Sequence, residues 1–129
     1  MKQHVWIGLR EAVAIHARAL TIYGGAAGLR DEGLLESALA KPRQIHAYAR
    51  STVHSLAAAY AAGIIRNHPF VDGNKRVGFV IGILFLELNG YRFHASEESA
   101  AQAVLSLAEG SLEEDGYAAF LSANSKRAR

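Results

Sequence analysis

Apolar residues recur at helical spacing along most of this chain, and only short stretches interrupt the pattern. In residues 10–23, Val13, Ala17 and Leu20 fall on one face of a helix, and the segment GGAAG (24–28) follows. Glycines at such a position typically end a helix, and GGAAG matches neither a dinucleotide-binding nor a P-loop motif. We therefore interpret this segment as a helix stop and turn rather than as a phosphate-binding loop.

The next segment predicts a short helix between an acidic residue and a proline. Asp31 is a suitable N-cap, because its side chain can accept a hydrogen bond from a free backbone N–H at the start of the helix. Leucine and alanine residues between positions 34 and 39 then follow helical spacing. Pro42 is expected to end this helix.

Two strongly apolar helices are expected in the middle of the chain. One starts near position 51 and contains HSLAAAYAAGIIRN, and the other starts near Asn74 and contains VGFVIGILFLELNG, closed by its Asn-Gly pair. Both are apolar on most sides, so they should lie at the centre of the core. Gly78 and Gly82 are four residues apart, a spacing that allows two helices to approach closely.

The last third of the chain mixes extended and helical patterns. Residues 91–94 predict a short strand, which could pair with residues 4–7. Two final helices follow, and the second is expected to open with a capping box formed by Ser111 and Glu114. These helices fit residues 96–108 and 112–123.

The pattern as a whole predicts an all-α protein. We expect one compact domain spanning residues 1–129, built as a helical bundle of about six helices with or without a small β flap. Residues 124–129 are expected to form a frayed basic tail.

Composition narrows the class of protein further. Half of the 129 residues are hydrophobic and 20% are charged, which is typical of a globular domain. The absence of cysteine excludes a disulfide framework and a thiolate metal site. The longest apolar run, Val77–Leu86, is shorter than the ~18 residues of a membrane span, and the first residues lack an apolar signal core. We therefore expect a cytoplasmic protein without membrane contact.

The charge pattern gives little indication of a nucleic-acid partner. The formal net charge is +2, and the basic residues are spread along the chain among acidic ones. A loose cluster of Lys41, Arg43 and Arg50, like the basic tail, is interpreted as solvated surface. No direct contact with nucleic acid is predicted.

The residues of greatest chemical interest lie between the two apolar helices, in HPFVDGNKR (68–76). His68 ends one helix, and an imidazole can take a proton from a hydroxyl group at cellular pH. Asp72 precedes the next helix and can hold Mg²⁺, which commonly combines one or two carboxylates with phosphate oxygens and waters. Phe70 lies between them and is expected to point into the core and fix the loop.

The start of the second apolar helix favours an anion. Gly73, Asn74 and Lys75 would present free backbone N–H groups there, and the helix dipole adds to their attraction for phosphate. The same dipole disfavours the cations Lys75 and Arg76 by roughly 0.3–1 kcal/mol, a cost that a bound polyphosphate would offset. A base, a metal-binding carboxylate, free N–H groups and cations within nine residues predict an enzyme. It would use Mg²⁺ and a nucleoside triphosphate to transfer a phosphorus-containing group.

Each of these residues alone has a simpler interpretation. A histidine at a helix end can be a capping residue, and Asp-Gly-Asn can be a turn with an N-cap. No GxSxG motif supports serine-based hydrolysis. The other histidines lack metal-binding spacing and are expected at the surface or at the edge of the core: His4, His16, His46, His54 and His94.

With these residues in view, HPFVDGNKR resembles the signature of the Fic/Doc (Fido) superfamily, and most closely its Doc, or death-on-curing, branch. Supporting blocks are YGGAAGLRDEGLLESALAKP (23–42) and LFLELNGYRF (84–93). The resemblance implies that His68 is the general base, that Asp72 is the Mg²⁺ ligand and that residues 73–75 form the anion-binding nest. It also implies that Arg76 binds phosphate, with Lys75 beside it in the catalytic site.

The branch within the superfamily depends on two positions. Nucleotide-transferring Fic proteins typically have glycine where this chain has Lys75 and a second arginine where it has Phe79. The Doc branch implies a helical Fido fold, ATP bound in the reversed sense and γ-phosphate transfer to a threonine of translation elongation factor Tu. It further implies a toxin that arrests translation and an antitoxin whose C-terminal segment docks on the toxin. AMP transfer of the Fic type and a catalytically idle partner-binding module remain open alternatives.

Overall fold

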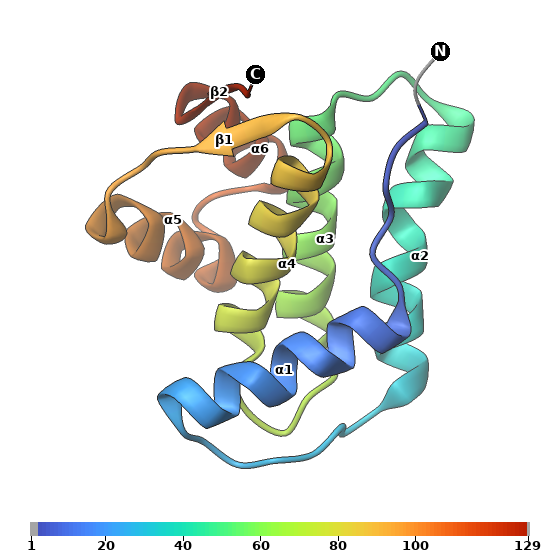
Figure 1. Ribbon diagram of the computed structural model, residues 1–129, viewed down its shortest axis with the longest axis vertical. Coiled ribbons are helices and arrows are strands. Elements are labelled where there is room, and N and C mark those ends of the chain that lie inside the picture. Colours follow the sequence, from blue (N-terminus) through green and yellow to red (C-terminus); the bar gives the residue numbers. More distant parts are fainter. Residues whose placement is uncertain (1–2, 129) are drawn as a thin grey trace.

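The computed structural model of the chain describes residues 3–128, and within this range it contains six helices and one two-stranded sheet (Figure 1). The predicted all-α class with a small β element is confirmed. The elements are α1 (Leu9–Tyr23), α2 (Glu32–Tyr48), α3 (Val53–Asn67), α4 (Asn74–Leu88), β1 (Tyr91–Phe93), α5 (Glu97–Glu109), α6 (Glu114–Ala123) and β2 (Ser125–Arg127). No helix in the described part of the chain is long and apolar enough to cross a membrane.

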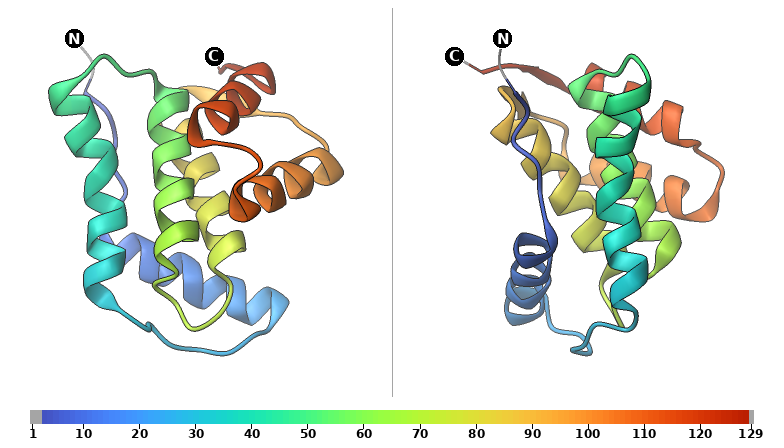
Figure 2. Two further views of the ribbon diagram at one scale, coloured as in Figure 1. Left: turned by 180° about the vertical axis from the view of Figure 1, so that it is seen from behind. Right: turned by 90° about the vertical axis from the view of Figure 1, so that its right-hand side faces the viewer.

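Helices α3 and α4 form the centre of the molecule, as their apolar sequences predicted. Figures 1 and 2 show α2 on one side of α3, the pair α5 and α6 on the other, and α1 crossing near the ends of α3 and α4 that the loop 68–73 joins. A Cβ atom at Gly82 would lie 3.1 Å from the carbonyl oxygen of Ala57, and one at Gly78 would lie 3.1 Å from that of Ala61. The two glycines therefore let α4 pack directly on the backbone of α3, as their spacing indicated.

Helix α2 is longer than predicted, because Pro42 does not end it. Asp31 caps the helix by accepting a hydrogen bond from Leu34 N at 3.0 Å, but α2 then continues through Pro42 to Tyr48. A proline inside a helix removes one backbone hydrogen bond and usually costs ~3 kcal/mol or more. Here the proline ring is buried, and the extra turns bring Ile45 against the core. Tertiary packing thus overrides the local preference.

The short strand at residues 91–94 was predicted, but its proposed partner was wrong. β1 pairs in antiparallel fashion with β2, with Tyr91 opposite Arg127. The segment 4–7 is held by side chains instead: Asn89 binds both the N–H and the carbonyl of Val5, at 2.8 and 3.0 Å. Because the amide side chain already occupies these backbone groups, this segment needs no strand partner.

Two further predictions for the C-terminal part are corrected. The expected frayed tail is ordered at residues 125–127, where the backbone pairs with β1. Ser111 and Glu114 do not form a capping box. The N-cap of α6 is Glu113, and no side chain caps this helix. The Ser111 hydroxyl donates to the carbonyl of Ser106 instead, at 3.3 Å. Because the Ser111 hydroxyl binds this nearby carbonyl, it does not cap α6 as predicted.

Candidate active site

The stretch 68–76 forms the loop between α3 and α4 together with the first turn of α4 (Figure 1). His68 is the C-cap of α3 and has left-handed backbone angles, φ 52° and ψ 52°. It is the only residue other than glycine with a positive φ between residues 3 and 128. Left-handed geometry is costly for a side chain with a Cβ and often marks functional positions. The side chain of His68 is exposed, and no hydrogen bond to its imidazole is found within the described range.

The loop is anchored to the core by Phe70 and Asn74. The Phe70 side chain is 1% exposed and belongs to the core. The Asn74 side chain is 3% exposed, accepts from Phe70 N at 3.0 Å and donates to Phe70 O at 3.0 Å. These paired hydrogen bonds close a ring that spans the loop. The sequence analysis placed the backbone N–H of Asn74 in an anion-binding nest; the Asn74 side chain is committed to the loop, so its backbone N–H is the donor that is left to serve a ligand.

The first turn of α4 contains backbone donors that have no acceptor in the described part of the chain. No side chain caps this helix, and the structure of residues 3–128 provides no acceptor for the backbone N–H groups of Asn74, Lys75 and Arg76. The N–H of Gly73, by contrast, donates to Asp72 Oδ1 at 2.8 Å. Lys75 and Arg76 are both exposed. Three N–H groups, the helix dipole and two cations make this end of α4 attractive to a phosphate group.

Asp72 projects an exposed, ionised carboxylate beside this turn. Its Oδ2 accepts from the backbone N–H of Ala26 at 3.2 Å, while its Oδ1 accepts from Gly73. These two hydrogen bonds, in that order, lower the pKa of the Asp72 carboxyl below its usual range, with smaller contributions from the charges of His16 and Lys75. Each carboxylate oxygen keeps a free lone pair, so the carboxylate fits a hard cation such as Mg²⁺.

The glycine segment after α1 therefore does more than end a helix. Gly25 has φ 117°, and a Cβ atom there would lie 2.9 Å from Asp72 Oδ2. Any larger residue would clash with the carboxylate, so the glycine permits the bond from Ala26. The sequence analysis missed this role, because nothing local to GGAAG indicates a contact with a residue 46 positions away.

A second distant contact supports the loop through Arg30. Its guanidinium donates from Nε to His68 O at 2.7 Å and from a terminal nitrogen to Asn67 O at 3.0 Å. Its backbone N–H donates to Pro69 O at 2.7 Å. The carbonyls of Asn67 and His68 lie at the C-terminal end of α3, where a cation satisfies groups that have no partner within the helix. Arg30 was not singled out from the sequence, although it lies in the supporting block 23–42.

Helix α1 adds two side chains to the same region. His16 stacks on Phe70, with ring centroids 4.0 Å apart and planes 9° apart, and its Nε2 lies 2.9 Å from Asp72 O. The guanidinium carbon of Arg76 lies 4.0 Å from the centre of the Tyr23 ring, within the range of a cation–π contact. The sequence placed His16 at the surface or core edge, whereas it is buried against the loop.

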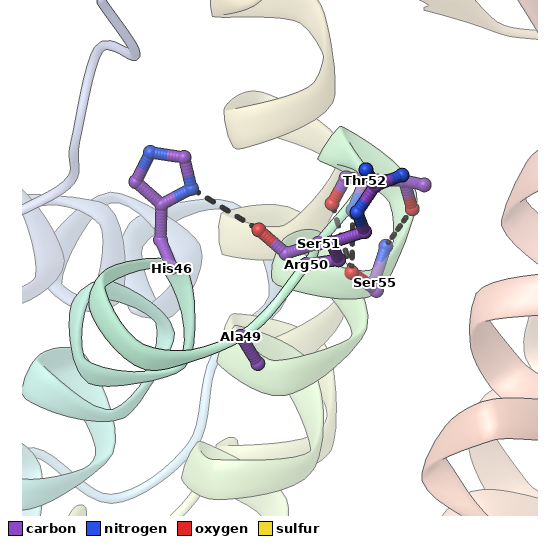
Figure 3. A pocket seen from close by; sticks show the side chains of 6 residues that line it. All are labelled: His46, Ala49, Arg50, Ser51, Thr52 and Ser55. Carbon is purple, nitrogen blue, oxygen red and sulfur yellow. Dashed lines mark hydrogen bonds between the residues drawn. The ribbon is translucent and has the colours of Figure 1, made fainter.

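A surface cavity of about 550 Å³ lies elsewhere, between the end of α2 and the start of α3 (Figure 3). It is lined by Arg50, Thr52 and Ser55 among others, and His46 Nδ1 there lies 3.1 Å from Ser51 Oγ. None of the residues of 68–76 lines it. Within residues 3–128, no group of three or more histidine or acidic side chains is arranged to hold a metal ion.

The fold and the loop define a class of protein: a small helical domain with an exposed histidine, an ionised carboxylate and an open helix start on one anchored loop. A family model described as Fic/DOC family matches residues 6–86, more than half of the chain. The chain belongs to this family.

Two curated relatives place it in the Doc branch. The first is Toxin Doc of Mycolicibacterium smegmatis, 39% identical over 77 residues, which cover 57% of this chain and 58% of that protein. The second is Protein kinase doc of Escherichia phage P1, 33% identical over 95 residues, which cover 73% of this chain and 75% of that protein. The first match thus spans less than two thirds of its relative.

Proposed function

We propose that this chain is the toxin of a toxin–antitoxin system and acts as a Mg²⁺- and ATP-dependent protein kinase in the cytoplasm. The observation that carries the proposal is the exposed His68 imidazole on the same anchored loop as Asp72 and the open start of α4. The relatives support it, since one is named a toxin and the other a protein kinase.

In the proposed phosphoryl transfer, His68 acts as the general base. The hydroxyl oxygen of a threonine attacks the γ-phosphorus of ATP, and the bond from that phosphorus to the β,γ-bridging oxygen breaks. His68 takes the hydroxyl proton, and ADP leaves with the electron pair of the broken bond. The left-handed backbone of His68 ends α3, and Arg30 donates to the His68 carbonyl. The backbone that carries the proposed base is therefore fixed before substrate binds.

The phosphates would be held by the start of α4. The N–H groups of Asn74, Lys75 and Arg76 are preorganised donors for phosphate oxygens, and Arg76 adds a planar fork. Asp72 would hold Mg²⁺, which neutralises developing charge on the phosphates when it is bound. The low pKa of the carboxyl keeps it ionised for this role at neutral pH.

The choice of γ-phosphate over AMP transfer rests on positions 75 and 79. Lys75 puts a bulky ammonium beside the N–H groups that a glycine would leave open. Phe79 packs against the core and meets Phe93 edge to face, with ring centroids 5.9 Å apart. An aromatic ring in this place cannot clamp the far end of a triphosphate. We infer that the nucleotide lies reversed, with its γ-phosphorus toward His68.

The proposed target is a threonine of translation elongation factor Tu, whose phosphorylation would arrest translation. The proposed partner is an antitoxin whose C-terminal segment docks on this domain. Both are carried over from the Doc resemblance rather than from contacts within this chain.

ATP labelled separately at the α and γ positions tests the reaction. The chain is incubated with cell extract and with purified elongation factor, and the modified protein is analysed by mass spectrometry. We expect only the γ label to transfer, with a phosphate increment on threonine. An adenylyl increment would overturn the kinase in favour of AMP transfer, and no label in any protein would favour the idle module. Asp72→Asn is the matched control, which should fold normally but transfer nothing.

A further inference from the structure

His16 is an unusual residue for the place it occupies. It lies in the middle of α1 and is 5% exposed, which makes it one of two buried polar or charged side chains in the described part of the chain. The other is Asn74, which anchors the active-site loop. Burying an imidazole costs free energy unless it is hydrogen-bonded, so its polar contact needs a reason beyond filling space.

The polar contact of His16 is a hydrogen bond to the backbone carbonyl of Asp72. Nε2 of His16 lies 2.9 Å from the backbone oxygen of Asp72, and a carbonyl oxygen can only accept. Nε2 therefore carries the hydrogen and donates it. The recipient is the backbone of the residue whose carboxylate is proposed to hold Mg²⁺.

Asp72 is thereby held at its backbone carbonyl and at its carboxylate by α1 and by the loop that follows α1. His16 fixes its carbonyl, while Ala26, in the loop after α1, fixes its carboxylate. The Gly73 N–H links the two ends through Oδ1. Outside these contacts Asp72 is exposed, and among the described residues His16 is the one from outside the loop that binds the peptide group joining Asp72 to Gly73.

The stacking of His16 on Phe70 is a separate interaction. A phenylalanine at position 16 could stack on Phe70 equally well and would avoid the cost of burying a polar group. The nitrogen is needed only for the bond to Asp72. The ring and the nitrogen can therefore be tested independently.

We propose that His16 is a positioning residue of the active site, which orients Asp72 for Mg²⁺ by donating to its backbone carbonyl. The proposal rests on the proposed function through the role of Asp72. His16 does not touch the nucleotide or the metal, and it acts only through Asp72, as residues behind metal ligands commonly do.

Two variants separate the ring from the nitrogen. His16→Phe keeps the stack and loses the donor, and His16→Gln keeps a donor near the ε position and loses the ring. The first measurement is made without metal or nucleotide: the amide resonances of Ala26 and Gly73, which both donate to the Asp72 carboxylate. We expect His16→Phe to shift both resonances and speed their exchange with solvent, although its melting temperature stays near that of the wild type. His16→Gln should shift them less, with a lower melting temperature.

The second measurement, made by calorimetry, is the Mg²⁺ concentration that gives half-maximal ATP binding. His16→Phe should raise it on the order of tenfold, and His16→Gln should restore part of the loss. His54→Phe is the control: it removes a different imidazole hydrogen bond, that to Ser125, at the other end of α3. This variant should leave the amide resonances of Ala26 and Gly73 and the Mg²⁺ dependence of ATP binding unchanged.

Unchanged amides in His16→Phe would overturn the proposal, as would shifted amides with an unchanged Mg²⁺ dependence, since the bond would then be purely structural. Failure of the proposed function has a different signature. A wild-type chain that binds no Mg²⁺ and ATP would refute the kinase, yet the amide measurement would still report whether His16 orients Asp72.

Discussion

At the scale of single residues, the loop of the candidate active site combines exposed with buried positions. His68 and Asp72 are exposed, whereas Phe70 and Asn74 are buried. The buried pair fixes the loop through the core and through two hydrogen bonds between the Asn74 side chain and the Phe70 backbone, and the exposed pair is accessible to solvent. A short stretch can thus combine a rigid backbone with accessible side chains, which is what positioning the proposed base and the proposed metal ligand requires.

The backbone of His68 leads to a prediction about stability and activity. Left-handed geometry costs a residue with a Cβ roughly 1–2 kcal/mol, and glycine escapes this cost while losing about 0.5–1 kcal/mol through the freedom of its unfolded chain. We therefore expect His68→Gly to keep or slightly raise the free energy of unfolding, measured by denaturant titration. Phosphoryl transfer by the same variant should fall by on the order of 10²–10⁴, the usual contribution of a positioned general base.

His68→Ala is the matched variant for this test. It also lacks the imidazole but keeps a Cβ, so it should be as inactive as His68→Gly and about 1 kcal/mol less stable. If His68→Gly proved clearly less stable than the wild type, the histidine would be contributing a structural contact. Near-normal transfer by either variant would refute its role as the base.

At the scale of elements, α3 and α6 each carry a fully buried tyrosine, but the two hydroxyl groups differ. Tyr60 of α3 accepts from Ile7 N at 2.9 Å and donates to Ile7 O, which ties the N-terminal segment to the central helix. Tyr117 of α6 has no hydrogen-bond partner for its hydroxyl in the structure of residues 3–128. Burial raises the pKa of both phenols, and for Tyr60 the Ile7 bond and the charge of Arg43 oppose the shift.

These two tyrosines should respond oppositely to loss of the hydroxyl. Tyr60→Phe leaves the N–H and carbonyl of Ile7 buried without a partner, so it should lower the free energy of unfolding by about 1–3 kcal/mol. Tyr117→Phe removes an unpaired buried hydroxyl and should be neutral or stabilising. Equilibrium unfolding of both variants measures the difference. A large loss of stability in Tyr117→Phe would show that the hydroxyl has a partner, such as a buried water.

Most helices could be predicted because their signals are local. The apolar periodicity of α3 and α4 lies within those helices, and the Asp31 cap and the glycine stop lie directly beside α2 and α1. The errors arose where distant contacts decide. Pro42 stays helical because of packing on the core, and β1 found its partner at residues 125–127 because a three-residue strand carries no information about its register.

The same distinction applies to the candidate site. Residues 68–76 are contiguous, so the sequence alone could bring a histidine, a carboxylate and a helix start together. The supporting residues come from far along the chain: His16, Ala26 and Arg30 contact the loop across 56, 46 and 38 positions. No local pattern marks such contacts. Only the supporting block 23–42 indicated that this region matters.

At the scale of the whole molecule, the site and the small sheet lie at opposite ends of α4. The loop precedes α4 and β1 follows it, and a helix of 15 residues is roughly 22 Å long (Figures 1 and 2). The end with the site is also the end where α1 contributes exposed apolar side chains, Ile22 and Tyr23, together with Val71 of the loop. A partner that covers the site would therefore also cover apolar surface, whereas one bound at the sheet would leave the site open.

We expect the chain to be toxic when it is expressed alone and harmless when the small protein encoded beside it is co-expressed. Toxicity should require transfer, so His68→Ala, which keeps the exposed surface, should permit normal growth. The same variant should still bind the antitoxin, because the exposed apolar side chains of Ile22, Tyr23 and Val71 are unchanged. Growth curves of the two chains, with and without the neighbouring protein, and co-purification of that protein with each chain provide the measurements. Harmless expression of a catalytically competent chain would count against the toxin role. Toxicity that persists in His68→Ala would show that the chain acts through binding, which is the role of an idle module rather than of a kinase.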